Sequence, residues 1–529
     1  MNAVVSKIAR RASPAANSNS DASDDIKSRY SPELVVALSG PVGAGVQHVQ
    51  EVLIRSLREH GYEVVPIKIS SAFSDLSDKL GVAGQPTDAA SESNRISRMQ
   101  DLGNSLRSIL GDDLGAQIAL DAIAHDRTAR HPGVDIKDIK PGRVAYIIDQ
   151  LKNPREALLL RKVYGNMFYL LGVLCGYERR KQNLEAMPMS APDAEALIAR
   201  DRAEANGGGQ QLEKTLKLAD FFVHNAHDNQ QELKKPIDRL LGLIHGKNGI
   251  TPTIIERGMY AAHSASLSSA CLSRQVGAAI LDVNGNIVST GCNDVPKAGG
   301  GLYPADNADQ RCVLIEGGVC FNDRHKDKVR DEIELTLREG GVGVAESKQL
   351  AQKIRSSTRL KDLIEFSRAV HAEMDALISL ARKGGSGVQN CIMFTTTYPC
   401  HNCARHIVAA GISSVYFIEP YGKSLAGELH RDSIDHDPSP QRALFSDDRD
   451  RRVAFVNFEG VAPRRFTDLF SAPDSRKNAV GRAIEVVSVN AVQLAPELLD
   501  NYRELEAKIV ERLKKKITDV GSVEPPRAG

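Results

Sequence analysis

The chain has 529 residues, which predicts two to four domains at roughly 100–200 residues per domain. Apolar residues make up 42% and charged residues 26%, which excludes collagen-like, low-complexity and wholly disordered chains. The 68 Lys and Arg residues nearly balance the 67 Asp and Glu residues, and this balance disfavours a protein that coats nucleic acid.

Cysteine content and apolar runs narrow the cellular setting. The eight cysteines are too few and too scattered for a disulfide scaffold. The longest apolar run, 168–175, is far shorter than the roughly 20 residues that span a bilayer. No apolar stretch follows Lys7, Arg10 and Arg11, so no signal peptide is visible. We expect a cytoplasmic protein without a membrane partner.

The N-terminal half predicts a disordered tail over residues 1–30 and an α/β domain over 31–248. A continuous apolar strand, a Gly-rich turn, an amphipathic helix and a second strand form a βαβ unit, which implies a parallel sheet. The predicted elements are strands at 34–38, 64–69, 144–148 and 221–223, helices at 46–57, 154–165, 212–219 and 230–245, and a loop or lid at 207–209.

The turn Gly40-Pro41-Val42-Gly43-Ala44-Gly45 lies between a strand and a helix, as a phosphate-binding loop requires. Val46 and Gln47 stand where the full motif has Lys and Ser or Thr, so phosphoryl transfer is not expected. Asp149 ends a strand, like the acidic residue that supports Mg²⁺ in such folds. The domain resembles the P-loop nucleotide kinases, with a degenerate loop.

Two interpretations of this loop stay open: retained binding of a nucleotide or phosphate through Gly40, Gly43, Gly45 and Asp149, or a structural remnant. Four arginines have the same ambiguity, because a charge-rich stretch can line a lid over phosphates or form a solvated face. They are Arg155, Arg161, Arg179 and Arg180.

A second domain is predicted over 249–475, followed by a helical tail over 476–529. The sequence Asn284-Gly285-Asn286 between two apolar runs indicates a hairpin. The predicted elements are a helix from 254, strands at 276–282 and 287–291, a polar insertion at 297–367, helices at 371–382 and 403–410, and strands at 391–397 and 414–418. An amphipathic helix ends the tail, and we expect it to pack on its own chain.

The most informative residues are His371-Ala372-Glu373 and Pro399-Cys400-His401-Asn402-Cys403. His371, Cys400 and Cys403 offer three ligands to one Zn²⁺ ion, and three ligands leave the fourth position for water, as in catalytic sites. Glu373 is placed to carry protons between that water and a substrate. This H-x-E…P-C-x-x-C arrangement is the known signature of the zinc nucleobase deaminases.

The alternatives to catalytic zinc are a structural knuckle, which needs four ligands, and a redox C-x-x-C pair, which follows a first strand. In the insertion, Cys312, Cys320 and His325 could build a second, structural metal site, although ordinary loop thiols are the default interpretation.

Residues 254–470 resemble the cytidine and deoxycytidylate deaminase superfamily beyond the zinc motif. Segment 271–278 is similar to the stretch before the first strand of deoxycytidylate deaminases, and 291–296 is similar to their Gly-x-Asn loop. The resemblance implies an α/β/α deaminase fold and substrate contacts from Asn293 and Arg274. Tyr398 stands where relatives often carry Ser.

A kinase-like domain ahead of a deaminase domain resembles a bacterial antiphage family, the dCTP deaminases. Segments 419–425, 429–434 and 460–463 extend that resemblance. It implies deamination of dCTP, and also of dCMP, by one Zn²⁺ ion per chain, with loss of dCTP as the defence. It further implies a homo-oligomer and, as in some members, an inhibitory small RNA.

Other functions compete with this hypothesis. A deaminase that edits cytosine or adenine in RNA or DNA needs a basic, aromatic-rich track, whereas aromatics are 5% here and Trp is absent. A housekeeping dCMP deaminase of nucleotide salvage would carry the same motif. A non-catalytic regulator would not need the complete set His371, Glu373, Cys400 and Cys403.

Overall fold

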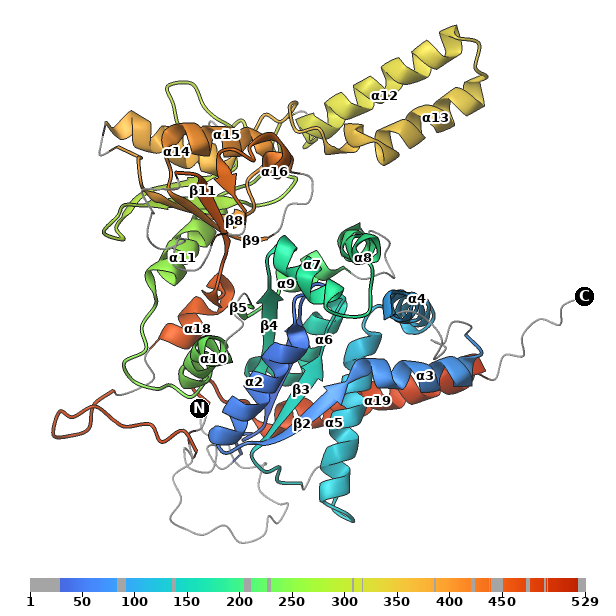
Figure 1. The fold of residues 1–529 in the computed structure, drawn as a ribbon, viewed down its shortest axis with the longest axis vertical. Coiled ribbons are helices and arrows are strands. Elements are labelled where there is room, and N and C mark those ends of the chain that lie inside the picture. Colours follow the sequence, from blue (N-terminus) through green and yellow to red (C-terminus); the bar gives the residue numbers. More distant parts are fainter. Residues whose placement is uncertain are drawn as a thin grey trace, which may run out of the picture.

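The computed structural model describes residues 29–521 with internal gaps. The residues outside the description are 1–28, 83–91, 136–138, 204–210, 226–229, 307–308, 316, 385–386, 420–423, 437, 439–450, 472–475, 490, 492 and 522–529. The predicted tail at 1–30, apart from its last two residues, and the predicted loop at 207–209 therefore lie outside it. The described chain is mixed α/β, with two six-stranded sheets in separate domains (Figure 1).

The first sheet has the strand order β12-β5-β4-β1-β3-β2. All its neighbours pair in parallel except β12, which runs antiparallel to β5. Its strands are β1 (Leu34–Ser39), β2 (Glu63–Lys68), β3 (Val144–Asp149), β4 (Phe168–Leu174), β5 (Phe221–His224) and β12 (Gly460–Val461). The predicted strands are confirmed. The apolar run at 168–175, for which no strand was predicted, contains β4, as is typical of a central parallel strand.

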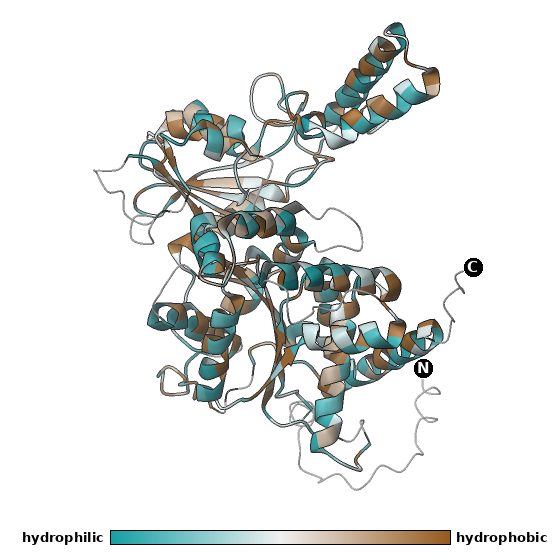
Figure 2. Ribbon diagram, turned by 45° about the vertical axis from the view of Figure 1, so that its right-hand side comes forward, coloured by the Kyte–Doolittle hydropathy of each residue, from teal (hydrophilic) through white to brown (hydrophobic). Residues whose placement is uncertain are grey.

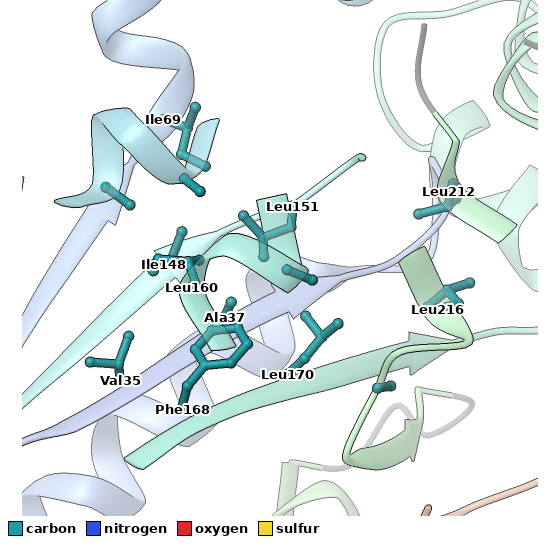
Figure 3. Close-up of a cluster of buried hydrophobic side chains, with 14 of the residues drawn as sticks. Val35, Ala37, Ile69, Ile148, Leu151, Leu160, Phe168, Leu170, Leu212 and Leu216 are labelled. Atoms are coloured by element: carbon teal, nitrogen blue, oxygen red, sulfur yellow. The ribbon is translucent and has the colours of Figure 1, made fainter. Parts of the chain in front are cut away.

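Alternation along β1 divides the first core into two layers. Leu34, Val36 and Leu38 pack against α2 (Val46–Glu59) and α10 (Gln230–Ile244). Val35 and Ala37 face the opposite layer, where Figure 3 shows them beside side chains of β3, β4 and α6. That layer contains α3 (Ile69–Leu80), α4 (Glu92–Leu110), α5 (Leu114–Arg130), α6 (Pro154–Tyr164) and α9 (Leu212–Leu216).

Two further helices, α7 (Tyr177–Glu185) and α8 (Ala191–Ala203), pack against each other above the carboxyl ends of the strands (Figure 1). A small separate cluster joins them, formed by Leu184, Ala194 and Ile198 with Val42 of the Gly-rich loop. The chain therefore folds back onto the predicted phosphate-binding loop.

The second sheet has the order β10-β11-β9-β8-β6-β7. Its strands are β6 (Gly277–Leu281), β7 (Ile287–Cys292), β8 (Ile392–Thr397), β9 (Ser414–Glu419), β10 (Ile434–Asp435) and β11 (Val453–Asn457). The predicted hairpin is confirmed, because β6 and β7 pair in antiparallel fashion and Gly285 has a φ of +77° at their turn. The helix α11 (Ile254–Ser266) packs on β6 and β8. The core on the other side includes α14 (Ala372–Lys383) and α15 (His401–Ala410).

The insertion forms a helical hairpin that projects from the second domain (Figure 1). Its helices are α12 (Phe321–Glu339) and α13 (Val344–Ser357), followed by the short turn η2 (Arg359–Asp362). Few of its residues are buried: Lys326 on α12, and Ser347 and Ala351 on α13. α12 and α13 pack on each other, and the base of the hairpin adjoins the second domain (Figure 1).

After β11 the chain returns to the first domain. Strand β12 adds to β5, and η3 (Pro463–Arg465), α18 (Phe466–Phe470) and α19 (Leu499–Gly521) follow. α19 packs on α5 and α6, so the terminal helix docks on its own chain. Its buried face includes Tyr502, Val510 and Leu513, whereas Leu505 is 40% exposed.

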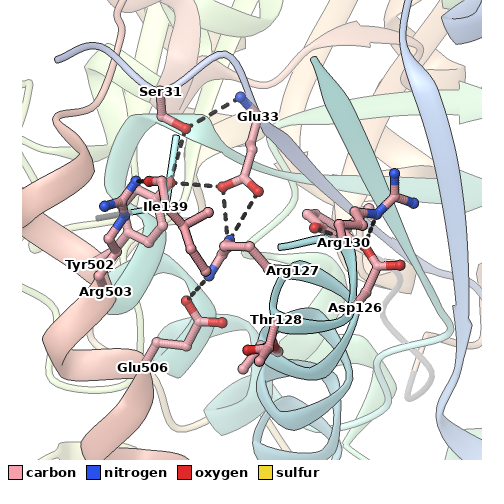
Figure 4. A network of polar contacts seen from close by, with 12 residues as sticks. Ser31, Glu33, Asp126, Arg127, Thr128, Arg130, Ile139, Tyr502, Arg503 and Glu506 are labelled. Carbon is pink, nitrogen blue, oxygen red and sulfur yellow. Dashed lines mark hydrogen bonds and ion pairs between the residues drawn. The ribbon is translucent and has the colours of Figure 1, made fainter. Parts of the chain in front are cut away.

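A buried polar network fastens α19 to the first domain (Figure 4). Arg127 of α5 donates to both carboxylate oxygens of Glu33 at 3.1 Å and to Glu506 of α19 at 2.8 Å. The Tyr502 hydroxyl donates to Glu33 at 2.7 Å. One guanidinium thus satisfies two carboxylates, which is how a buried charge is tolerated.

Hydrophobic residues gather on the strands, while most helices carry both hydrophilic and hydrophobic residues (Figure 2). No helix in the described part of the chain combines the length and apolar composition that a membrane crossing demands.

Candidate active site

Two helix starts bring the predicted metal ligands together. His371 is the N-cap residue of α14, and Cys400 is the N-cap residue of α15, where its sulfur accepts the Cys403 amide at 3.4 Å. The two helices are neighbours on one face of the second sheet. Because the N-terminus of a helix favours negative charge, this placement also stabilises cysteine thiolates.

The ligand atoms fit a single zinc ion. The Nδ1 atom of His371 lies 3.3 Å from the sulfur of Cys400 and 3.3 Å from that of Cys403. Tetrahedral Zn²⁺, with bonds of about 2.0–2.3 Å, places its ligand atoms roughly 3.5 Å apart. Within the described residues, this is the one group of three or more His, Cys, Asp or Glu side chains arranged to hold a metal.

Electrostatics supports the same assignment. The neighbouring Cys403 and His371 side chains lower the pKa of the Cys400 thiol well below its ordinary value, which favours the thiolate form. Thiolates, and not thiols, bind metals. Both cysteines are buried, at 5% and 1% exposure, so the ligand set is shielded from bulk water.

Glu373 lies beside the ligands without being one of them. It is 4% exposed, and the Cys403 thiol donates to its Oε2 atom at 3.5 Å. Burial raises the pKa of the Glu373 carboxyl above its ordinary value. A buried carboxyl with a raised pKa is suited to accepting and returning a proton during a reaction.

A pocket of about 260 Å³ opens onto this centre. His371, Glu373 and Cys400 line one part of it, and Arg274 and Asn293 line another. The structure therefore brings every predicted residue of the second-domain site around one pocket except Cys403, which does not line the pocket but contacts Glu373. That the pocket binds substrate through Arg274 and Asn293 stays a prediction.

Asn293 has a structural part in this pocket. Its Oδ1 atom accepts the Val276 amide at 2.7 Å, and its Nδ2 atom donates to the Arg274 carbonyl at 2.9 Å. The amide side chain thus holds the segment that carries Arg274 against the pocket. The Arg274 side chain lies 3.9 Å from Glu419, at the end of β9.

Glu419 also connects the two domains. Lys217, just after α9 of the first domain, donates to its carboxylate at 2.7 Å, and Thr397 of the pocket wall donates to it at 3.2 Å. One carboxylate therefore contacts the first domain and the pocket wall.

Sequence analysis missed several pocket residues. Asn322, Lys326 and Lys361 come from the insertion, whose polar sequence resembles any solvated helix pair. Only folding places these three residues beside the motif. Tyr398, which precedes Cys400 by two residues, also lines the pocket, and its hydroxyl lies 3.0 Å from Nδ1 of His436.

The second metal site considered in the insertion gains no support from the described residues. Cys312 and Cys320 line a small cavity of about 20 Å³ with Cys271. His325 instead stacks on Phe366, with ring centroids 5.5 Å apart. These side chains do not form a metal-ligating group of three in the described structure.

The Gly-rich loop is covered by its own chain. Gly43 and Gly45 have φ values of +80° and +68°, which explains why glycine stands at both positions. The Val42 amide donates to Asp201 of α8 at 2.7 Å, and the Asp201 side chain is 1% exposed. Arg180 of α7 donates to the Val42 carbonyl at 2.8 Å.

More side chains close the loop from below. Lys152 donates to the Gly40 carbonyl at 3.0 Å and lies 3.6 Å from Asp201. Asn225 donates to the Ala44 carbonyl at 2.8 Å. Asp149 ends β3, where burial raises the pKa of its carboxyl, with Lys68 and Lys152 acting against that rise. The Gly-rich loop follows β1 and Asp149 ends the neighbouring strand β3, so both lie at the carboxyl ends of adjacent parallel strands.

The four ambiguous arginines do not share one environment. Arg180 faces the loop, with its side chain 15% exposed and 3.8 Å from Asp201. Arg161 pairs with Asp220 at 2.6 Å, whereas Arg155 is 72% exposed.

Comparison with known proteins identifies the second domain. A family model described as "Cytidine and deoxycytidylate deaminase zinc-binding region" matches residues 252–419. The deoxycytidylate deaminase of Enterobacteria phage T2 is 32% identical over 168 residues, which cover 31% of this chain and 80% of that protein. The deoxycytidylate deaminase of Enterobacteria phage T4 is 31% identical over 169 residues, covering 31% and 78%.

A solved dCMP deaminase from the cyanophage S-TIM5, in complex with dCMP and dUMP, is 19% identical, with a TM-score of 0.23, over 39% of this chain and 98% of that chain. Residues 252–419 of this chain, which the family model matches, contain Glu373 and the metal ligands His371, Cys400 and Cys403. This chain therefore belongs to the cytidine and deoxycytidylate deaminase family.

Proposed function

We propose that this enzyme hydrolytically deaminates deoxycytidine nucleotides, converting dCTP to dUTP and also dCMP to dUMP. The observation that carries the proposal is one pocket containing both Glu373 with the His371 and Cys400 ligand atoms, and cationic side chains able to meet phosphate. The relatives' names, deoxycytidylate deaminases, support a deoxycytidine nucleotide as substrate.

The residues of the site have separable parts in this reaction. His371, Cys400 and Cys403 would hold Zn²⁺, which would lower the pKa of a water molecule toward neutrality. Glu373 accepts one proton of the attacking water and delivers it to N3 of cytosine, and it then carries the remaining proton, from the hydroxyl group formed at C4, to the leaving amine. The C4–O bond forms, the C4–N4 bond breaks, and ammonia leaves. Burial of Glu373 excludes competing bulk water.

We further propose that dCTP depletion in the cytoplasm is an antiphage defence, that the enzyme is a homo-oligomer, and that a small RNA inhibits it. The support is the order of domains, with a Gly-rich-loop domain ahead of the deaminase domain, as in the antiphage dCTP deaminases. Infection of cells carrying wild type or a Glu373→Ala variant, with dCTP pools measured, tests the defence role. Equal phage yield and equal dCTP in both strains would contradict it.

For the first domain we propose a P-loop-kinase-like fold that binds a nucleotide phosphate at Gly40, Gly43 and Gly45, near Asp149, without phosphoryl transfer. The support is the position of β1 at the centre of a parallel sheet. The connection after β1 leads to one side of the sheet, and the connection after β4 leads to the other side. Parallel sheets bind ligands at the carboxyl ends of the strands where this direction reverses. Because Asp201 accepts the Val42 amide, phosphate at this loop would replace that carboxylate.

The substrate proposal is tested by incubating the zinc-loaded protein with dCTP, dCMP and a cytosine-containing single-stranded oligonucleotide. We expect uracil nucleotides from the first two. Glu373→Ala should lower turnover by about 10²–10⁴-fold, the usual contribution of general acid–base catalysis, with zinc content unchanged. Glu339→Ala, on the exposed end of α12, is the matched control. Turnover of the oligonucleotide alone would favour an editing deaminase and contradict the proposal.

A further inference from the structure

One part of the pocket wall is built by the base of the insertion. Asn322 and Asp323 come from the first turn of α12, Lys326 from its second turn, and Lys361 and Asp362 from η2. This wall and the catalytic residues line the same cavity of about 260 Å³. A substrate held at Glu373 therefore extends toward residues that lie outside the family motif.

Two hydrogen bonds make this wall a defined structure. The Lys326 ammonium donates to the Lys361 carbonyl at 2.7 Å, and the Asn322 amide donates to the Leu363 carbonyl at 3.0 Å. Lys326 is only 6% exposed, so its bond is shielded from solvent. Together the two bonds fix segment 361–363 against α12, and this fixes the position from which the Lys361 side chain reaches the pocket.

The charges of the wall favour an anion. Lys361 is exposed, and within the described residues its ammonium makes no hydrogen bond or ion pair. α12 begins at Cys320 without a side-chain cap, so the positive end of a 19-residue helix reaches the pocket uncapped. The Cys320 sulfur lies 3.7 Å from the Ser273 hydroxyl, which places this helix start beside Arg274.

Acidic neighbours reduce this positive charge without cancelling it. Asp323 lies 3.9 Å from Arg355, a cation of α13 that does not line the pocket. Asp362 is the other carboxylate on the wall. This lining thus carries Arg274, Lys326 and Lys361 against two carboxylates. Asp323 is shared with Arg355, and Arg274 is shared with Glu419, which leaves Lys361 as the cation directed at the pocket.

We propose that the base of the insertion is the phosphate subsite, and that Lys361 is the residue that favours a triphosphate over a monophosphate. This inference rests on the proposed deamination of deoxycytidine nucleotides. The cytosine ring must lie at Glu373, so the 5′ substituent extends along the pocket toward the wall. Three linked phosphates carry more charge and reach further than one, and a lysine ammonium binds phosphate as a compact point charge.

The test compares kcat/KM for dCTP, dCDP and dCMP in wild type, Lys361→Ala and Lys361→Arg. We expect Lys361→Ala to lower kcat/KM for dCTP about tenfold, the effect of losing one charge-assisted contact, and to lower that for dCMP less. Lys361→Arg keeps the charge and should restore the preference for dCTP. Lys353→Ala, on an exposed face of α13 in the same hairpin, should change neither value.

Binding measured without turnover separates this inference from the proposed function. In a Glu373→Ala background, the ratio of the Kd of dCMP to the Kd of dCTP should fall toward one when Lys361 becomes Ala. An equal loss for all three nucleotides, or an unchanged ratio, would overturn the phosphate subsite. Failure of wild type to deaminate any of the nucleotides would overturn the proposed function, whereas the binding ratio would still decide the subsite.

Discussion

In both domains, a helix begins shortly after the carboxyl end of a strand, and its first residues belong to the candidate binding site. In the second domain β8 leads through Tyr398 and Pro399 to Cys400, the N-cap residue of α15. In the first domain β1 leads through the Gly-rich loop to Gly45, the N-cap residue of α2. Cysteine brings a ligand atom to the helix start, whereas glycine offers only backbone amides.

The surroundings of the two helix starts differ as much as their residues. The cysteine site opens into a pocket of about 260 Å³. At the glycine loop, a carboxylate from α8 already accepts one of the loop amides, and side chains from α7 and from the end of β5 bind its carbonyls. The comparison teaches that the backbone motif supplies the capacity for binding, and that the segments packed against it determine whether the site is open.

The largest effect is expected when a metal ligand is removed from the open pocket of the second domain. Cys403→Ser takes away a metal ligand and the thiol that contacts Glu373. We expect loss of zinc and a fall in turnover of at least about 10³-fold, because without the metal the water is not activated. Metal analysis and turnover assays check both. Cys391→Ser, at a buried cysteine outside the site, is the control, and full activity of Cys403→Ser would break the comparison.

A second prediction concerns the stability of the first domain, in which the Gly-rich loop is covered. His245 of the first domain is buried, and burial together with Arg143 lowers its pKa to about 4. Its Nδ1 atom lies 2.7 Å from the Leu241 carbonyl, which assigns the proton to Nδ1, and Nε2 then accepts from Tyr62 at 2.9 Å. A second proton would place a positive charge beside the Arg143 guanidinium, 3.3 Å away.

Acid should therefore destabilise this domain. The pKa of His245 lies below its unfolded value of 6.5, so the unfolded chain binds the extra proton first as pH falls. The loss begins near pH 6.5 and reaches about 3 kcal/mol by pH 4. Urea unfolding of wild type and His245→Gln at pH 7.5 and pH 5 measures it, with a smaller pH dependence expected in the variant. Equal pH dependence in both proteins would show that His245 does not carry the effect.

The smallest effect is expected when the Gly-rich loop of the first domain is uncovered. Asp201→Ala removes the carboxylate from the Val42 amide and leaves Lys152 and Arg180 without it. We expect the free energy of unfolding to fall by about 1–3 kcal/mol and the affinity for inorganic phosphate to rise, because an anion can then take the vacated position.

Calorimetric titration with phosphate and urea unfolding provide the two readouts for Asp201→Ala. Asp193→Ala, on the exposed side of α8, is the control. Phosphate affinity that stays the same as in wild type would show that the loop is structural. The Gly-rich loop and the metal site would then differ in whether they bind a ligand at all, and not only in whether a ligand can reach them.

Sequence reasoning reached the strands and the metal ligands because both have local signals. A continuous apolar run predicted β1, and the spacing of Cys400 and Cys403 predicted a shared metal. No strand was predicted at β4, because periodicity alone does not distinguish a continuous apolar run in a strand from one in a buried helix. Sequence reasoning also missed Lys361, because a lysine in a polar insertion carries no mark of the pocket that it lines.

The sequence by itself determined the chemistry of the open site. The helix start at Cys400 brings Cys400 and Cys403 together by local geometry, and His371 and Glu373 share the start of a second helix. Packing of α14 beside α15 then joins the two pairs. Only the tertiary structure decided what surrounds each helix start. Asp201 lies 159 residues after Val42 of the glycine loop, so their contact depends on packing of distant segments. Lys361 precedes His371 by only ten residues, but it lies at the pocket because Lys326 of α12 bonds its carbonyl.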